Sequence, residues 1–305
     1  MTHLRHAIER IDVTRSRRLV TLGLPLAALA ALLLLAACAP MAALNAVVPG
    51  DDYRIEAGVA YGEHPRQRMD IYVPLAAAPP AGWPMVVFFY GGSWNTGERA
   101  DYKFLAQALA VRGVMVLVAD YRLYPEVRYP DFLHDSARAL AYGLDQAQRL
   151  QADPKRIFVM GHSAGAYNAA MLAFDARWLA PTGHATSELA GFIGLAGPYD
   201  FLPMTNPQTQ PVFFHPNYPP NTQPLDHASR QAPRSFLGAP EHDQVVDPQR
   251  NTVGLADKLR SLGVPVEVHL YPRASHVLLA GAFAAPLRWI APVLPQVVAF
   301  IEARP

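Results

Sequence analysis

The sequence predicts an α/β fold in which a mostly parallel central sheet carries helices on both of its faces. Short runs that are apolar at every position, such as 85–90 and 114–119, are typical of strands buried on both faces. Segments with the apolar spacing of helices separate these runs, and this alternation is typical of parallel sheets. The chain of 305 residues is 51% hydrophobic, so it can bury the core that one large domain requires.

Each expected element follows from its own pattern of apolar residues. Leu105 and Leu109 lie about one turn apart in the first expected helix, as Val297 and Ile301 do in the last. The expected strands, in chain order, are 68–74, 85–90, 114–120, 157–160, 189–197, 234–239 and 266–271. The expected helices cover 101–112, 131–150, 163–175, 251–262 and a final segment from about Pro295.

Residues 202–233 interrupt this alternation. They are rich in proline, asparagine, glutamine and aromatic residues, and their apolar positions show little periodicity. An irregular loop of this length inside a compact domain is typically either a functional lid or a disordered insertion. We expect it to form a cap over the active site, within one domain that spans residues 51–305.

The first 37 residues have the layout of a secretory signal peptide, because five arginines precede an apolar stretch that ends in small residues. The segment Leu35 to Cys38 resembles the bacterial lipobox, whose cysteine is lipidated, and Cys38 is the only cysteine in the sequence. We therefore expect a signal peptide over 1–37 and a lipidated tether over 38–50. This predicts a protein anchored to a membrane of the cell envelope, facing the periplasm or the exterior. An uncleaved transmembrane anchor and plain secretion are the alternatives.

The composition disfavours several classes of function. Charged residues make up only 17% of the chain and the formal net charge is +1, whereas nucleic-acid binding usually requires a clustered basic surface. No spacing typical of metal ligands is present, and we expect neither a metal nor a cofactor. A single cysteine cannot form a disulfide within the chain. The oligomeric state stays open.

A lone serine stands on a tight corner between an expected strand and an expected helix, in the stretch GHSAG at 161–165. Ligands of α/β sheets bind beyond the carboxyl ends of the strands, where this turn lies. Gly161 and Gly165 keep side-chain bulk away from the bend, and the helix N-terminus points free N–H groups at whatever Ser163 attacks. This context indicates a nucleophile elbow, with a plain strand-to-helix turn as the alternative.

A serine hydroxyl needs a general base to become a good nucleophile, and the base needs a group that orients it. In this arrangement the acid and then the histidine follow the serine along the chain. His276 follows the last expected parallel strand and is the predicted base. Asp243 follows the strand before it and is the predicted acid, with Glu241, Asp247 and Asp200 as alternatives.

The reaction also needs N–H donors that are already in place to stabilise the developing oxyanion. The N–H of Ala164, directly after the serine, is one expected donor. Gly91 and Gly92 follow a buried strand and are expected to supply the others, because glycine lets the backbone approach a ligand closely. A plain Gly-Gly turn is the alternative.

Together these motifs resemble those of the α/β-hydrolase superfamily, and more narrowly the carboxylesterase branch near hormone-sensitive-lipase-like and arylformamidase-like enzymes. The matching pieces are YGGSW at 90–94, DYRLYPE at 120–126, GHSAG at 161–165 and the loops of Asp243 and His276. The resemblance covers about residues 52–303 and implies an α/β-hydrolase fold. The family usually has histidine where this chain has Tyr90, so the support around the oxyanion donors must differ.

The resemblance implies a serine carboxylesterase that hydrolyses short-chain or aryl esters through an acyl-enzyme. The alternatives are an arylformamidase or amidase, an acyltransferase, and a binding lipoprotein without activity. An apolar acyl or aryl pocket would be lined by Tyr90, Trp94, Tyr199, Phe213 and Phe214. The expected partners are therefore a small-molecule ester and, through the lipid on Cys38, a membrane.

Overall fold

The computed structural model describes residues 40–303, so Cys38 and the expected signal peptide lie outside the described residues. The chain divides near residue 47 into two units. Helix α2, Pro40–Ala46, belongs to the first unit and occupies most of the segment that we expected to be a tether. The second unit begins at Val48 and contains every other described element.

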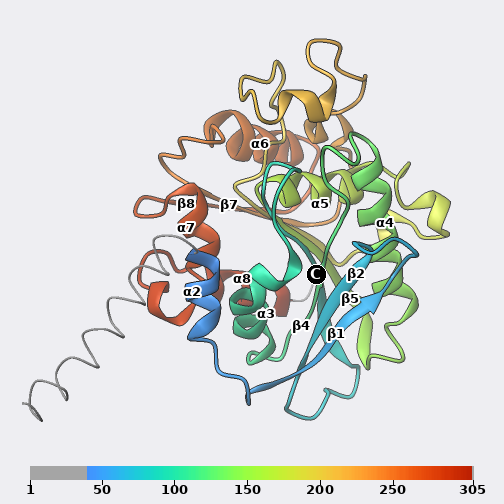
Figure 1. The fold of residues 1–305 in the computed structure, drawn as a ribbon, viewed down its shortest axis with the longest axis vertical. Coiled ribbons are helices and arrows are strands. Elements are labelled where there is room, and N and C mark those ends of the chain that lie inside the picture. The colour runs from blue at the N-terminus through green and yellow to red at the C-terminus, as the bar shows by residue number, and fades with distance from the viewer. Residues whose placement is uncertain (1–39, 304–305) are drawn as a thin grey trace, which may run out of the picture. The chain divides into compact units, whose positions relative to one another are not determined.

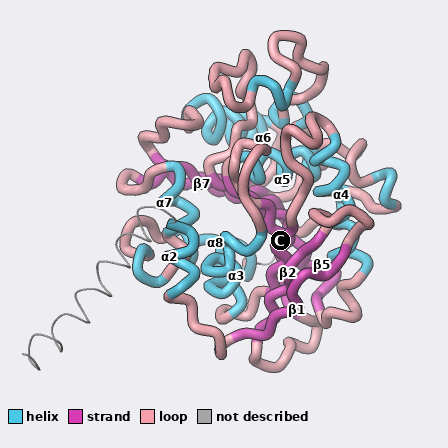
Figure 2. Tube along the Cα trace, in the orientation of Figure 1, coloured by secondary structure: helices cyan, strands magenta, loops and turns pink. Residues whose placement is uncertain are grey.

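A single eight-stranded sheet forms the centre of the second unit (Figures 1 and 2). Its strands are Tyr53–Ala60 (β1), Arg68–Pro74 (β2), Trp83–Phe89 (β3), Met115–Ala119 (β4), Ala152–His162 (β5), Gly191–Leu195 (β6), Ser235–Pro240 (β7) and Val266–Tyr271 (β8). Their order across the sheet is β1-β2-β4-β3-β5-β6-β7-β8, and every pair from β4 to β8 is parallel. Only β1 and β2, at one edge, pair antiparallel. The predicted fold class, a mostly parallel sheet, is confirmed.

Helices cover both faces of this sheet. Their bounds are Lys103–Ala110 (α3), Asp131–Asp145 (α4), Ala164–Phe174 (α5), Gly254–Ser261 (α6), His276–Gly281 (α7) and Val293–Glu302 (α8). Helix α3 contacts α8, and α4 contacts α5; the two pairs lie on opposite sides of the sheet (Figure 1). No helix within residues 40–303 is both long enough and apolar enough to span a membrane.

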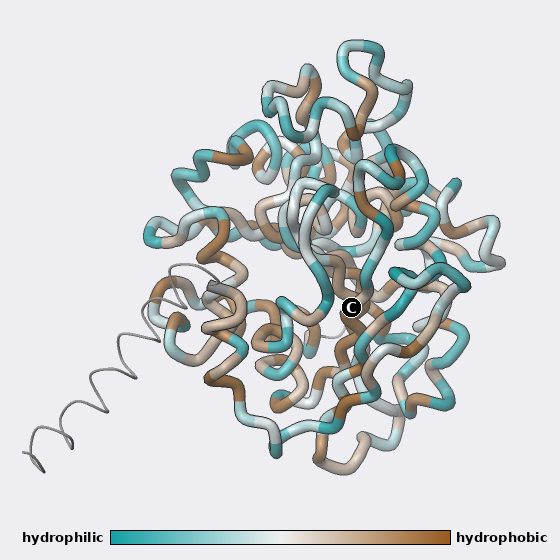
Figure 3. Tube along the Cα trace, in the orientation of Figure 1, coloured by the Kyte–Doolittle hydropathy of each residue, from teal (hydrophilic) through white to brown (hydrophobic). Residues whose placement is uncertain are grey.

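The core lies between the sheet and these helices. All residues of β3, β4 and β6 are buried, which is why their sequences are apolar without alternation. Hydrophobic residues follow the strands through the middle of the unit, and hydrophilic residues occupy the outer loops (Figure 3). Strand β1 was not predicted, because most of its side chains are exposed and it has no apolar run.

Residues 202–233 contain no strand and no α-helix, only two short 3₁₀ turns at Gln210–Phe213 and Pro224–His227. The segment is coloured gold at the top of Figure 1. It is nevertheless packed, since Val212 and Phe213 are completely buried. Its backbone is held by side chains: Gln223 Oε1 accepts hydrogen bonds from two backbone N–H groups, those of Phe201 and Leu202, both at 2.8 Å.

Candidate active site

Ser163 occupies the turn between β5 and α5. Its backbone has φ 54° and ψ −123°, a strained combination for a residue with a side chain and the one expected of a nucleophile elbow. The Ser163 N–H donates to the carbonyl of Leu195 at 2.8 Å, which ties the turn to the end of β6. A Cβ atom added at Gly161 would lie 2.1 Å from the carbonyl oxygen of Gly165, so only glycine fits this corner. The sequence therefore encodes the strained turn locally.

A continuous line of hydrogen bonds joins Ser163, His276 and Asp243. The distance from Ser163 Oγ to His276 Nε2 is 2.8 Å, and that from His276 Nδ1 to Asp243 Oδ2 is 2.7 Å. His276 begins α7 just after β8, and Asp243 follows β7. These loops meet because neighbouring parallel strands end at the same edge of the sheet. The structure thus brings together the three residues that the sequence predicted to act together.

The environment keeps the Asp243 carboxylate ionised. Burial alone would raise its pKa, but the hydrogen bond and charge of His276 act against burial. The N–H groups of Val245 and Val246 also donate to Asp243 Oδ1, at 2.8 and 3.2 Å. The net result is a pKa below the ordinary range of an aspartate. Asp243 can therefore orient the imidazole while carrying its negative charge.

His162, the residue before the serine, is a part of this site that sequence reasoning missed. Its Nε2 lies 2.9 Å from the carbonyl oxygen of His276, and a carbonyl only accepts, so Nε2 carries the proton. Burial, and then the nearby His276, lower the pKa of His162 to about 3, so the ring is neutral at neutral pH. The available signal was its position inside the GHSAG motif.

The loop 90–97 after β3 lies directly against the serine. A Cβ atom at Gly91 would be 2.9 Å from Ser163 Cβ, which shows how closely the two backbones approach. Gly91 therefore lies against the nucleophile turn, and its role as an oxyanion donor stays a prediction.

The next two residues of the loop have unusual backbone conformations. Gly92 has φ 130°, and Ser93 has φ 53°, a left-handed conformation that is uncommon for serine. Ser93 and Ala164 both line the cavity that contains Ser163. Ala164 begins α5, so its N–H has no partner in the preceding helical turn. Ser93 and Ala164 are therefore the candidate donors that border the cavity, and Gly92 stays a predicted donor.

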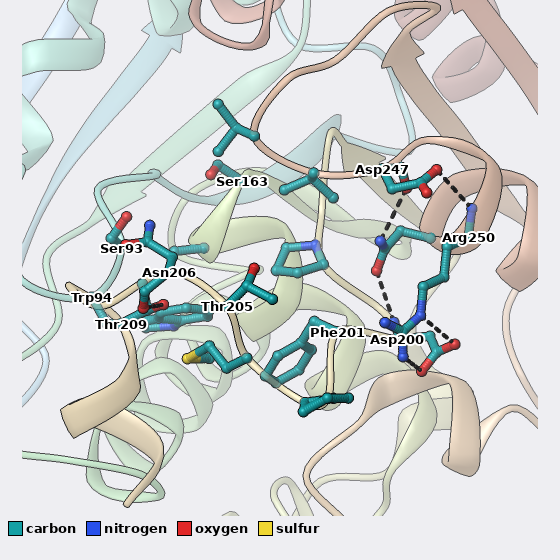
Figure 4. A pocket seen from close by; sticks show the side chains of 17 residues that line it. Ser93, Trp94, Ser163, Asp200, Phe201, Thr205, Asn206, Thr209, Asp247 and Arg250 are labelled. Atoms are coloured by element: carbon teal, nitrogen blue, oxygen red, sulfur yellow. Dashed lines mark hydrogen bonds and ion pairs between the residues drawn. The ribbon is translucent and has the colours of Figure 1, made fainter. Parts of the chain in front are cut away.

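A cavity of about 240 Å³ opens beside Ser163 (Figure 4). Trp94 lines it, as predicted from the sequence. An apolar part of its wall comes from Phe201, Met204 and two prolines. The other lining residues are Ser93, Ala164, Thr205, Asn206, Thr209, Val245, Val246, Asp200, Asp247, Arg250 and Asn251.

The other four aromatic residues predicted for the pocket do not line this cavity. Tyr90 and Tyr199 are completely buried, and the Tyr90 hydroxyl forms hydrogen bonds with Arg66 and Asp120. Phe213 is also buried and packs edge-on behind Trp94, with ring centroids 4.9 Å apart. Phe214 is 40% exposed, and its ring lies 5.3 Å from the Arg128 guanidinium. These predictions were wrong because aromatic residues near a motif serve the core as readily as the cavity.

One wall of the cavity is charged, which the sequence did not indicate. Arg250 Nε and Nη2 donate to the two carboxylate oxygens of Asp200, each at 2.9 Å. Asp247 Oδ1 accepts from the N–H groups of Gln249 and Arg250. Asn251 Oδ1 accepts from the N–H groups of Tyr199 and Asp200, which ties the charged wall to the loop after β6. Asp200 and Asp247, the alternative acids, are thus part of the wall and not partners of His276.

No group of three or more histidine, cysteine, aspartate or glutamate side chains within residues 40–303 is arranged to hold a metal ion.

The BD-FAE family model matches residues 69–259, which is more than half of the chain. The chain belongs to the BD-FAE family. The matched region contains Ser163 and Asp243, and His276 follows it. The assignment confirms the predicted carboxylesterase branch of the α/β-hydrolases.

Named relatives agree with this assignment. Carboxylesterase NlhH of Mycobacterium tuberculosis is 30% identical over 227 residues, 67% of this chain and 69% of that protein. A probable isoprenylcysteine alpha-carbonyl methylesterase of Arabidopsis thaliana is 26% identical over 245 residues, 73% of this chain and 51% of that protein. The chain spans between about a third and just over half of the length of the plant relatives it matches.

Solved structures show the same fold. A bacterial heroin esterase has a TM-score of 0.70 and 23% identity, over 87% of this chain and 90% of that one. A Pyrobaculum calidifontis esterase has a TM-score of 0.66 and 20% identity, over 86% of this chain and 88% of that one.

Proposed function

We propose that this protein is a serine carboxylesterase. The observation that carries the proposal is the unbroken line of hydrogen bonds from Asp243 through His276 to Ser163, at the edge of a cavity. A binding module has no need for a strained serine aligned with an oriented imidazole. The similarity to carboxylesterase NlhH supports the same conclusion.

In the proposed mechanism Ser163 Oγ attacks the ester carbonyl while His276 Nε2 accepts its proton. The oxyanion is stabilised by the N–H of Ala164 and by N–H groups of residues 91–93. His276 then returns the proton to the leaving alcohol, and an acyl-enzyme remains on Ser163. Water, activated by His276, releases the acid. Asp243 stays ionised and stabilises the imidazolium that forms in both steps.

The cavity supports short acyl or aryl substrates. Its volume of about 240 Å³ is small, and Trp94 and Phe201 form aromatic parts of its wall. The wall also carries Asp200, Asp247 and Arg250, which have a formal charge of −1 together. We therefore propose that the preferred esters are compact and carry no negative charge.

The decisive experiment is the hydrolysis of p-nitrophenyl acetate, butyrate and laurate by the purified protein, with Ser163→Ala as the control. We expect kcat/KM to fall by several orders of magnitude in the variant and to be higher for butyrate than for laurate in the parent. Equal rates in both proteins would remove Ser163 from the reaction. A higher kcat/KM on laurate would refute the compact acyl site.

Trp94 in the cavity also favours aryl substrates, which keeps an arylformamidase activity as a second candidate. Comparing an N-formyl aryl amide with the matched aryl formate ester separates the two functions. A higher kcat/KM on the amide would support the formamidase. Failure of a serine-directed fluorophosphonate to label Ser163 would instead favour a binding protein on this fold.

We further propose that the protein is anchored to a membrane by a lipid on Cys38, which the signal layout of the first 37 residues supports. Radiolabelled palmitate in an expressing bacterium should label the parent and not Cys38→Ser. Inhibition of the lipoprotein signal peptidase should retain the unprocessed chain. Labelling that is unchanged in Cys38→Ser would contradict the anchor.

A further inference from the structure

One guanidinium group holds both ends of the loop that carries Ser93. Arg66 Nη2 donates to the Tyr90 hydroxyl at 2.6 Å and to the carbonyl oxygen of Gly97 at 2.8 Å. Tyr90 is the first residue of the loop 90–97, and Gly97 is the last. Arg66 itself belongs to the turn between β1 and β2, and its Nε donates to the carbonyl oxygen of Tyr121 at 2.9 Å.

Tyr90 is held from further directions. Its hydroxyl donates to Asp120 Oδ1 at 2.9 Å, and its carbonyl oxygen accepts from the Tyr121 hydroxyl at 2.8 Å. The rings of Tyr90 and Tyr121 stack with centroids 4.9 Å apart. Asp120 is only 3% exposed, and the backbone N–H and guanidinium of Arg99 also bind it. A network with this many hydrogen bonds around buried side chains has little freedom to move.

The loop 90–97 is packed tightly against the turn that carries Ser163. A Cβ atom at Gly97 would lie 2.9 Å from the carbonyl oxygen of Gly91, and one at Gly91 would lie 2.9 Å from Ser163 Cβ. A Cβ atom at Gly165 would lie 2.5 Å from the carbonyl oxygen of Tyr90. A displacement of either loop end is therefore transmitted to the N–H groups that face the reacting carbonyl.

We propose that Arg66 is a positioning residue for the loop 90–97, which we call the oxyanion loop. It acts through Tyr90 and Gly97, the two ends of that loop. The inference rests on the proposed esterase function. Neither Arg66 nor Tyr90 lines the cavity, so neither contacts the substrate. The planar fork of Arg66 matters because Nη2 binds both loop ends while Nε, in the same plane, binds the carbonyl oxygen of Tyr121. The single nitrogen of a lysine in its place cannot keep all three bonds in this geometry.

The test compares Arg66→Lys with Arg68→Lys in the full-length protein. Arg68 is the matched control, since it stabilises the same turn through the carbonyl oxygens of Gly62, His64 and Gln67, without contacting the loop 90–97. We expect Arg66→Lys to lower kcat about 10- to 100-fold with KM changed less than about twofold, as for a partly misplaced donor. Arg68→Lys should leave both constants within about twofold.

Two further measurements separate positioning from general destabilisation. The affinity for a trifluoromethyl ketone, whose adduct places an oxyanion in the hole, should fall in Arg66→Lys as much as kcat/KM does. Amide hydrogen exchange of the peptide covering 90–97 should accelerate in Arg66→Lys and not in Arg68→Lys. Tyr90→Phe should show a smaller loss of kcat, because Arg66 keeps its bond to Gly97 and lies 3.8 Å from Asp120.

The results that would refute the positioning role of Arg66 differ from those that would refute the proposed esterase function. Equal kinetic effects in Arg66→Lys and Arg68→Lys, a loss confined to KM, or unchanged exchange over 90–97 would each refute the positioning role. An inactive parent protein that no fluorophosphonate labels would refute the esterase itself. In that protein the exchange comparison would still decide whether Arg66 holds the loop, and the kinetic role assigned to it would be lost.

Discussion

The loop 90–97 and the segment 202–233 both border the cavity beside Ser163, but they are held in different ways. The loop is tied to the core through completely or almost completely buried side chains, Tyr90 and Trp94, and through Arg66. The segment is anchored in the core through the completely buried Phe213, but its part that borders the cavity is held by bonds to nearby backbone, such as Tyr218 Oη accepting from the N–H of Met204 at 2.9 Å. Its cavity-facing residues Thr205 and Asn206 are exposed.

This difference suits the loop 90–97 to the catalytic chemistry and the exposed wall of the cavity to the selection of substrates. The oxyanion donors must stay in place to within a fraction of an ångström, so their loop is part of the rigid sheet architecture. A wall that selects substrates can vary without disturbing the reacting groups, and surface loops tolerate such variation. Changes on the loop side are therefore expected to lower kcat strongly, and changes on the cavity wall to alter substrate preference weakly.

The largest effect is expected at the catalytic residues, which are held as firmly as the loop 90–97, and specifically from Asp243→Asn. The change removes the charge that stabilises the His276 imidazolium and favours the wrong tautomer, so kcat should fall about 10⁴-fold. Steady-state kinetics on p-nitrophenyl butyrate measure the loss. Glu241→Gln is the control, an exposed carboxylate two residues away. A loss of less than about tenfold in Asp243→Asn would mean that another group orients the histidine.

The next effect is expected from Gly91→Ala. Its Cβ atom would lie 2.9 Å from Ser163 Cβ and 3.1 Å from His162 Nδ1, so the loop or the serine turn must shift. A misplacement of this kind lowers kcat by about 100-fold. Gly254→Ala is the control, because its Cβ would have only an ordinary contact of 3.6 Å. Unchanged turnover in Gly91→Ala would show that the loop 90–97 can move without loss of activity.

A third prediction concerns how the buried His162 makes the stability of the folded protein depend on pH. The pKa of His162 is lowered to about 3 by burial and by His276, whereas the unfolded histidine titrates near its ordinary value of about 6.5. Below pH 6.5 the unfolded chain therefore binds a proton that the folded chain does not, so the folded state loses stability as the pH falls toward 3. Between pH 6.5 and 5 this loss amounts to about 2 kcal/mol.

His162→Asn removes this contribution. Urea unfolding of both proteins at pH 7 and pH 5 should show a smaller decrease in the variant, whatever its stability at pH 7. The other histidines are common to both proteins, so their titration cancels in the comparison. Identical decreases would mean that His162 is protonated in the folded state at pH 5.

The smallest effect is expected on the cavity wall. Asp247→Asn removes one exposed negative charge and keeps an oxygen that can accept the N–H bonds of Gln249 and Arg250. Hydrolysis of mono-p-nitrophenyl glutarate, relative to the neutral pentanoate, should rise about three- to fivefold, because exposed charges are strongly screened. Asp257→Asn, on α6 and away from the cavity, is the control. An unchanged ratio would remove Asp247 from substrate selection.

The sequence by itself determined the alternation of strands and helices and the position of the serine turn. Buried parallel strands must be apolar at every position, and a tight corner must have glycine at 161 and 165, so both leave local signals. The order of serine, acid and histidine also follows from the connectivity of such a sheet. These features need only neighbours along the chain to be recognised.

Only the tertiary structure decided which aromatic side chains face the cavity and what supports the oxyanion loop. Tyr90 is close to Ser163 in space, yet its ring points into a network formed with Arg66 and Asp120, from three separate segments. The pairing of Asp200 with Arg250 likewise joins loops that follow different strands. Such contacts depend on how loops from distant parts of the chain meet at the sheet edge, and no local periodicity encodes that meeting.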